Sequence, residues 1–199
     1  FWEDWQRECH MEYYDKGKVK QIDMNGLVKV HGGWTRANPK KGLTIKVDKY
    51  LPESSMNYKF FKDKNFTDFK SIVLRAAGND WQFAHFRDAL ISQSLKFAHT
   101  DWVAYHECVV FLNGAYWGIY EVRELTNATY PENNYGVDND SIDLVRGNDW
   151  AIEGTMTAYN TTHNFVAGNN MSVQANFDQA KAMIDLENAK RVESWIKEA

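Results

Sequence analysis

Alternation of apolar and polar residues in the first half of the chain predicts short β-strands. Within residues 43–48 every second side chain is apolar, so the apolar side chains should face a core and Lys46 should point away from it. Other runs of strand length occur at residues 8–14, 26–31 and 71–76. Turn-forming residues separate these runs, which favours several short strands over one long element.

A β-hairpin is predicted at residues 108–122. Two apolar and aromatic runs flank Asn113 and Gly114, and Asn-Gly is the dipeptide that most readily adopts the positive φ angles of a type I′ turn. We therefore expect positive φ at both residues and antiparallel strands on either side of them. A helix in this stretch would contradict the prediction.

Two amphipathic helices are predicted in the rest of the chain. From residue 81 to residue 99 the apolar period changes to about 3.6, with Asp80 as a candidate N-cap. The residues expected on the core-facing stripe of this helix are Phe83, Phe86, Leu90 and Phe97. Residues 177–196 fit a second helix, whereas residues 154–176, rich in Asn, Thr, Ser and Ala, predict a loop or lid. Together these elements predict an α+β fold with packed helices and a mixed or antiparallel sheet.

Composition restricts the classes of protein that this chain can represent. Its 199 residues suffice for one large domain, and a hydrophobic share of 44% with only three prolines indicates a globular protein. The net charge of -4 provides no basic field for a phosphate backbone, so nucleic acid is not expected as the main partner. No apolar run approaches the roughly 18 residues of a membrane span, and the first residues lack the features of a signal peptide.

Few residues suggest metal or redox chemistry. Cys9 and Cys108 are the only cysteines, and two cysteines are compatible with one disulfide or with two free thiols. His106 belongs to no zinc-binding motif and lies beside a predicted buried strand, so a structural role is expected for it. An acidic cluster without a fixed metal-ligand spacing consists of Asp138, Asp140 and Asp143.

A basic, glycine-containing turn lies between two of the predicted strands. Its sequence is His-Gly-Gly-Trp-Thr-Arg at residues 31–36, followed by Pro-Lys-Lys-Gly at residues 39–42. Open backbone amides at Gly32 and Gly33, with basic side chains nearby, suit phosphate oxygens. The turn lacks the patterns of a P-loop and of a Rossmann loop, and by itself a solvated connection between strands is the simpler interpretation.

Four segments of the chain, taken in order, match the blocks of a known family. Residues 109–124, VVFLNGAYWGIYEVRE, are similar to the pattern FLNGEYWGIYxxRE. The basic turn is a second block, and LRAAGNDW at residues 74–81 with FRDAL at residues 86–90 is a third. NYGVD and IDLVRGN within residues 134–148 form the fourth. Over about residues 5–148 the chain therefore resembles the CotH (spore-coat protein H) family of atypical, secreted protein kinases.

The resemblance implies a kinase-like N-lobe, in which a glycine turn, a lysine-bearing strand, a helix and a hairpin lead to a hinge at residues 121–124. Kinases of this family would use Mg²⁺ to transfer the γ-phosphoryl group of ATP to a protein hydroxyl group. By this resemblance Lys46 or Lys41 pairs with the phosphates, and Glu124 lies near the adenine-side hinge. The nucleotide-binding residues so implied are Gly32, Gly33, Arg36, Lys41, Lys46, Arg87 and Glu124.

The resemblance also implies a layout and a location. A single CotH-like domain would consist of an N-lobe at about residues 5–125, a connector and lid at about 126–176, and a C-terminal helix at about 177–198. The protein would be secreted or held at the cell surface. Its partner there would be a protein substrate or another surface protein.

The catalytic motifs of the family have no match in this chain. In the family, an Asp/Asn motif and a metal-binding Asp-x-Asp motif follow the helix predicted at residues 177–196, and neither pattern occurs here. We therefore expect no catalytic residue and no metal site in this chain, and whether it is itself an enzyme stays open. The alternative function is a non-catalytic surface module that binds glycans or a partner protein, because eight Trp and ten Tyr exceed what burial usually requires.

Overall fold

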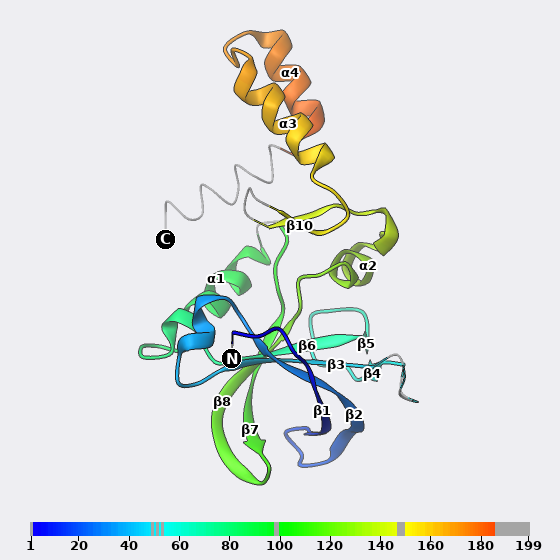
Figure 1. Ribbon diagram of the computed structural model, residues 1–199, viewed down its shortest axis with the longest axis vertical. Coiled ribbons are helices and arrows are strands. Elements are labelled where there is room, and N and C mark those ends of the chain that lie inside the picture. The colour runs from blue at the N-terminus through cyan, green and yellow to red at the C-terminus, as the bar shows by residue number, and fades with distance from the viewer. Residues whose placement is uncertain are drawn as a thin grey trace. The chain divides into compact units, whose positions relative to one another are not determined.

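A six-stranded antiparallel sheet is the largest element of the computed structural model (Figure 1). Its strands are β1 (Arg7–Tyr14), β2 (Lys20–His31), β3 (Gly42–Lys46), β6 (Ser71–Arg75), β7 (Tyr105–Leu112) and β8 (Ala115–Glu124). In space they follow the order β1-β2-β3-β6-β8-β7, and every neighbouring pair is antiparallel. The predicted α+β fold is confirmed, and of the two predicted sheet types the antiparallel one is correct.

The structure describes residues 2–48, 50, 52, 54–97, 100–146 and 150–185, which divide into two compact units. The first unit, residues 1–93 with 103–126, contains the sheet, the strand pair β4 (Met56–Asn57) and β5 (Asp68–Phe69), the 3₁₀ turns η1 (Trp34–Ala37) and η2 (Gly78–Asp80), and most of α1 (Arg87–Leu95). The second unit, residues 94–102 with 127–199, contains α2 (Thr129–Tyr135), η3 (Asn139–Ser141), β9 (Leu144–Arg146), β10 (Trp150–Glu153), α3 (Thr157–Gly168) and α4 (Gln174–Met183). Within the described ranges, no helix combines the length and apolar character needed to cross a membrane.

One face of the large sheet is apolar and carries the core of the first unit. Residues paired in antiparallel register point to the same face. The buried side chains on this face include Ile22, Met24, Ile45, Ile72, Tyr120 and Val122. Phe60, Phe61 and Phe69 pack against it through ring contacts that include Tyr13 and His106. His106 is therefore part of an aromatic core, and burial lowers its pKa.

The opposite face of the sheet carries charged residues. Arg75 of β6 is the register partner of Glu121 of β8, and Arg123 lies on the same face two residues further along β8. Asp88 anchors α1 to this face, because it forms ion pairs with both arginines. Thr44, in the middle of β3, lies on this charged face and is only 2% exposed. Both faces of the sheet are therefore shielded from solvent at this point. We call the charged face the polar face.

The hairpin predicted at residues 108–122 is confirmed by β7 and β8. Asn113 and Gly114 connect the two strands with φ angles of 49° and 78°, the positive pair that a type I′ turn requires. β8 continues as far as Glu124, so residues 121–124, where a hinge was predicted, form the end of this strand. β8 is hydrogen-bonded to both β6 and β7.

The helix predicted at residues 81–99 begins later than expected. α1 starts at Arg87, because the chain turns after Asp80 and His85 adopts a φ of 68° that no α-helix allows. The Asp80 carboxylate accepts hydrogen bonds from the backbone N–H groups of Ala84 at 3.3 Å and Arg87 at 3.2 Å. Asp80 thus reaches the start of the helix across a turn, which sequence periodicity does not reveal.

The core-facing stripe predicted for this helix is also wrong. Its residues have exposed fractions between 51% and 82%, and they are Phe83, Phe86, Leu90 and Phe97. The buried residues of α1 are instead Ala89 and Ser92. The Ser92 hydroxyl donates to the carbonyl oxygen of Val103 at 2.8 Å. Small side chains on this side let α1 approach the sheet closely enough for Asp88 to reach the arginines.

Much of residues 154–176, where a loop was predicted, is helical. α3 occupies residues 157–168, and α4 begins at Gln174 and contacts α3 (Figure 1). The Thr161 hydroxyl donates to the carbonyl oxygen of Thr157, one turn earlier in α3, at 2.9 Å. Threonine is unfavourable inside many helices, but here its hydroxyl is bonded within the helix itself. The helix predicted at residues 177–196 corresponds to α4 as far as Met183, and its remainder from residue 186 lies outside the described residues.

Candidate functional site

A cluster of charged side chains, some of them buried, lies on the polar face, next to α1. Oδ2 of Asp88 lies 2.8 Å from Nη2 of Arg75 and 2.7 Å from Nη1 of Arg123. The arginines come from the neighbouring strands β6 and β8, and Glu121, the register partner of Arg75, lies on the same face. Glu121 and Arg123 are only 6% and 8% exposed, so both groups are largely removed from water. Burying charged groups in this way costs free energy unless every one of them is paired.

Hydrogen bonding within the cluster is incomplete. Among the described residues, Nε of Arg75, Nε of Arg123 and Oε2 of Glu121 are buried atoms with no hydrogen-bond partner. Nη1 of Arg123 lies 3.9 Å from this Glu121 oxygen, which is too long for a hydrogen bond. Burial raises the pKa of Glu121 to about 7, although the positive charge of Arg123 opposes the rise. A buried carboxyl group that titrates near neutral pH is more typical of functional sites than of structural cores.

A cavity of about 170 Å³ opens beside this cluster. Its lining consists of His31, Val73, Arg75, Val103, Arg123 and residues 124–126. A smaller hollow adjoins the basic turn and is lined by His31, Thr35, Asn38, Lys40, Gly42, Arg75, Ala76 and Gly78. The two hollows share His31 and Arg75. The charge cluster and the basic turn are therefore parts of one continuous surface.

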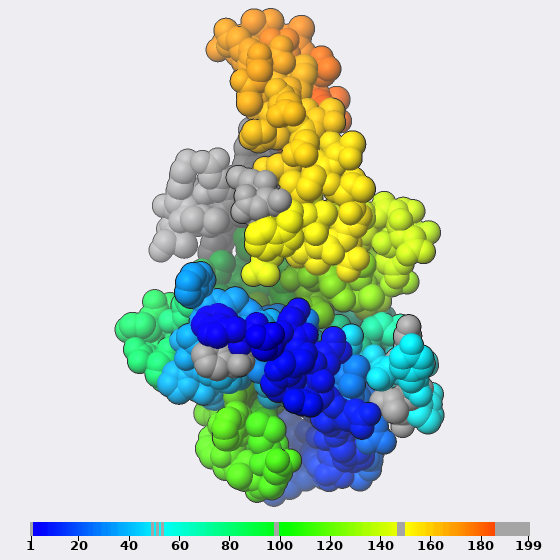
Figure 2. All heavy atoms as spheres, viewed as in Figure 1, coloured from blue at the N-terminus to red at the C-terminus, as the bar shows by residue number. Residues whose placement is uncertain are grey.

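The basic turn adopts a backbone conformation that requires glycine at residue 32. Gly32 has a φ of 105°, and a Cβ at this position would collide with the hydroxyl of Thr35. Nε of Arg36 donates to the carbonyl oxygen of Gly32 at 2.6 Å, and Nη2 of Arg36 lies 3.0 Å from a carboxylate oxygen of Asp4. Figure 2 shows the N-terminal segment, in dark blue, on the surface of the first unit. Gly32, Gly33 and Arg36 therefore lie together in the turn, and the Arg36 guanidinium group forms an ion pair with Asp4.

Lys41 and Lys46 lie at opposite ends of β3. Nζ of Lys41 donates to the carbonyl oxygen of Asn38 at 2.6 Å, which holds this lysine at the basic turn. Lys46 is four residues further along the strand than Gly42, a distance of about 13 Å at the usual rise of a strand. Its register places it on the polar face, away from the apolar core. Lys41 is therefore the only one of the two lysines that lies beside the turn.

Arg87 and Glu124 have partners away from the turn. Nε of Arg87 lies 2.7 Å from Oδ1 of Asp80, at the start of α1. The side chain of Glu124 points to the apolar face, where Oε2 lies 3.1 Å from Nζ of Lys64 and accepts a hydrogen bond from the backbone N–H of Ala104 at 2.7 Å. The structure therefore brings the turn residues together but places these two residues at separate positions.

The residues of this site that the sequence patterns did not single out include Arg75, Asp88, Glu121 and Arg123. Their signal in the sequence is the alternation of charged and apolar residues at the end of a strongly apolar strand, Glu-Val-Arg-Glu at residues 121–124. Such alternation indicates that one face of the strand is charged. It does not show that Arg123 pairs with a residue 35 positions earlier in the chain.

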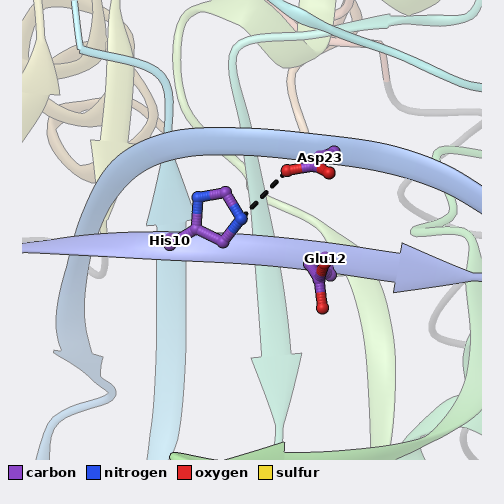
Figure 3. Close-up of side chains that lie close together, drawn as sticks. All are labelled: His10, Glu12 and Asp23. Atoms are coloured by element: carbon purple, nitrogen blue, oxygen red, sulfur yellow. Dashed lines mark ion pairs between the residues drawn. The ribbon is translucent and has the colours of Figure 1, made fainter.

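One group of side chains in the described part of the chain has the spacing of a metal site. It consists of His10, Glu12 and Asp23, which lie exposed on β1 and β2 (Figure 3). Nε2 of His10 lies 2.9 Å from Asp23, and Nζ of Lys20 pairs with Glu12 at 3.1 Å and also with Asp23. The lysine supplies the positive charge that a cation would bring. We therefore interpret this group as a surface ion-pair network.

Both cysteines are free thiols. Burial raises the pKa of Cys9 and raises that of Cys108 to about 12. A thiol with a raised pKa stays protonated at neutral pH and is a poor nucleophile. The sequence was compatible with one disulfide or with two free thiols, and the structure contains two free thiols.

Comparison with known proteins identifies one family. The family model described as CotH kinase protein matches residues 28–197, which is most of the chain. The resemblance found in the four sequence segments is thereby confirmed. Neither the curated proteins nor the solved structures contain a match to this chain.

Proposed function

Because the chain belongs to the CotH kinase family, we propose that its first unit binds ATP with Mg²⁺ for phosphoryl transfer to hydroxyl groups of a protein substrate. The observation that carries this proposal is the continuity of the basic turn with the cavity through His31 and Arg75. Open glycine amides and guanidinium groups are the donors that phosphate oxygens favour. Family membership and donor chemistry therefore support the same function.

The segment after β8 supports a position for the nucleoside part of the ligand. Leu125 and Thr126 line the cavity directly after Glu124. The buried ion pair between Glu124 and Lys64, each 6% exposed, holds the end of β8 in place. In this proposal Glu124 acts by fixing the adenine-side segment. Mg²⁺ would arrive with the nucleotide, because this ion is held largely by phosphate oxygens and water.

The proposal is tested by calorimetric titration of the 199-residue chain with Mg²⁺–ATP. Lys41→Ala should weaken binding by about tenfold or more, since one charge-assisted contact to phosphate is lost. Lys46→Ala tests the other end of β3. Lys62→Ala is a matched control, because this exposed lysine lies in the segment that packs against the apolar face. No binding of ATP by the unaltered chain would refute the proposal, and equal affinities in all variants would remove the lysines from the site.

A second candidate function is a surface module that binds glycans or a partner protein. It is favoured by the tip of the β7-β8 hairpin, where Phe111 and Tyr116 are each 62% exposed and Trp117 is 45% exposed. Exposed aromatic rings stack on sugars and occur often at interfaces. Titration with soluble oligosaccharides, compared between the unaltered chain and Trp117→Ala, tests this candidate. For either function we propose a secreted or cell-surface location, as the family resemblance implies.

A further inference from the structure

The end of the β7-β8 hairpin extends beyond the sheet. β6 pairs with β8 only from Glu121 to Glu124, whereas β7 pairs with β8 as far as the turn at Asn113 and Gly114. Residues 109–119 therefore form a two-stranded ribbon that projects from the sheet (Figure 1). A two-stranded ribbon needs packing on one of its faces to be stable in water.

Four large apolar side chains share one face of this ribbon. Val109 of β7 is the register partner of Ile119 of β8. Phe111, two residues further along β7, is the partner of Tyr116, and their rings meet edge to face with centroids 5.8 Å apart. Register partners, and residues two apart on one strand, point to the same face. We call these four residues the hairpin patch.

The hairpin patch is a large apolar surface. Its side chains are between 55% and 62% exposed, so at roughly 150–250 Å² each they expose about 450 Å². A contiguous apolar surface of this size usually marks an interaction site. Two such patches packed together would bury about 900 Å², and the neighbouring Leu112 and Trp117 would add to this area. The total approaches the roughly 1,200 Å² at which stable interfaces begin, which is typical of a weak dimer.

Charges at the border of the patch favour one orientation for a second copy. Exposed Glu107 lies two residues before Val109 on the same face, and its register partner is Glu121. The turn at the other end of the patch is uncharged. If two copies pack face to face about a two-fold axis that runs across the strands, Glu107 of each copy lies over the turn of the other. The acidic ends are then kept apart, and Val109 of one copy lies over Phe111 of the other.

We propose that the hairpin patch is a self-association surface, at which two copies of this chain pack face to face about such a two-fold axis. An isologous interface uses the same residues on both copies, so each patch supplies half of the contact. The aliphatic pair of one patch packs on the aromatic pair of the other, and no charged side chain of the patch is buried. The inference does not depend on ATP binding, and it narrows the partner protein of the second candidate function to a second copy of the chain.

Sedimentation equilibrium of the 199-residue chain, at about 5 to 500 μM protein, tests the inference. We expect a monomer–dimer equilibrium with a dissociation constant on the order of 10–100 μM, because the interface is small. Val109→Glu and Phe111→Lys should each raise this constant by about tenfold or more, since each places an unpaired charge in the interface. Phe97→Lys is the matched control, because Phe97 is 82% exposed outside the hairpin, and its constant should equal that of the unaltered chain.

Mixing the two hairpin variants tests the orientation of the copies. The glutamate of Val109→Glu would lie over the lysine of Phe111→Lys, while the second Val109-Phe111 contact keeps its natural residues. An equimolar mixture should therefore form a heterodimer at concentrations at which each variant alone is monomeric. A mixture that stays monomeric would overturn the proposed packing.

The outcomes separate the inference from the functions proposed above. An unaltered chain that binds ATP but stays monomeric would overturn the inference and leave the proposed function standing, and a dimer that binds no ATP would do the reverse. A monomer whose binding of soluble oligosaccharides is lost in Phe111→Lys would assign the patch to a glycan instead. Where a variant does not fold, amide NMR signals of the unaltered chain decide: those of residues 109–119 should shift with protein concentration, and unmoved signals overturn the inference.

Discussion

Replacing Glu121 with glutamine should change how the stability of the protein depends on pH. Glu121 is 6% exposed, and burial raises its pKa from the ordinary 4.5 to about 7. The folded protein therefore binds a proton at this site over a pH range in which the unfolded chain has released it. By linkage, stability is greatest when the group is protonated and falls as pH rises through this window. Glu121→Gln keeps the shape of the protonated side chain but cannot ionise.

The expected size of the effect follows from the two pKa values. One pKa unit corresponds to about 1.4 kcal/mol, so the rise from 4.5 to about 7 corresponds to about 3 kcal/mol of unfolding free energy in all. About 2 kcal/mol or more of this loss should occur between roughly pH 5 and pH 8. The other charged groups that affect Glu121 are Arg123, Asp88, Arg75 and Asp80, and their contributions are already contained in the raised pKa.

Urea unfolding of both proteins across this pH range provides the measurement. The difference in unfolding free energy between Glu121→Gln and the unaltered chain isolates the contribution of this group, because the other titrating residues are common to both. The glutamine variant should become more stable than the unaltered chain as pH rises. A difference that stays constant with pH, or that changes in the opposite direction, would refute the assignment of a buried, protonated Glu121.

Three further predictions concern the hairpin, the buried ion pair and catalysis. Gly114→Ala should lower the unfolding free energy by about 1 kcal/mol, because φ is 78° while no atom lies within 4 Å of the new Cβ; an unchanged urea midpoint would contradict a strained turn. Lys64→Ala should lower the unfolding free energy, measured by thermal unfolding, by about 3 kcal/mol or more, because it removes the cation beside buried Glu124. A decrease no larger than that of Lys62→Ala would show that the ion pair does not stabilise the fold. The 199-residue chain by itself should transfer no phosphate from radiolabelled ATP with Mg²⁺ or Mn²⁺, because it lacks the catalytic motifs of the family. Autophosphorylation abolished by asparagine at Asp138, Asp140 or Asp143 would instead make the acidic cluster catalytic.

Local features of the fold were predictable because they depend on neighbouring residues. The turn at Asn113 and Gly114 follows from the positive φ that this dipeptide tolerates, and the strands follow from alternation that places one set of side chains on a core. Family membership was also accessible, because ordered blocks of sequence carry it. The start of α1 was not, since Asp80 reaches the backbone of Arg87 across an intervening turn.

The candidate site was only half determined by the sequence. The sequence by itself places Gly32, Gly33 and Arg36 in one turn, because they are adjacent along the chain. Only the tertiary structure brings Arg75 and Arg123 to the same Asp88 oxygen, since strand order and helix approach decide which distant charges meet. It likewise decides that Glu121 is buried enough for its pKa to reach about 7, because desolvation depends on everything packed around a group and not on the residues next to it in sequence.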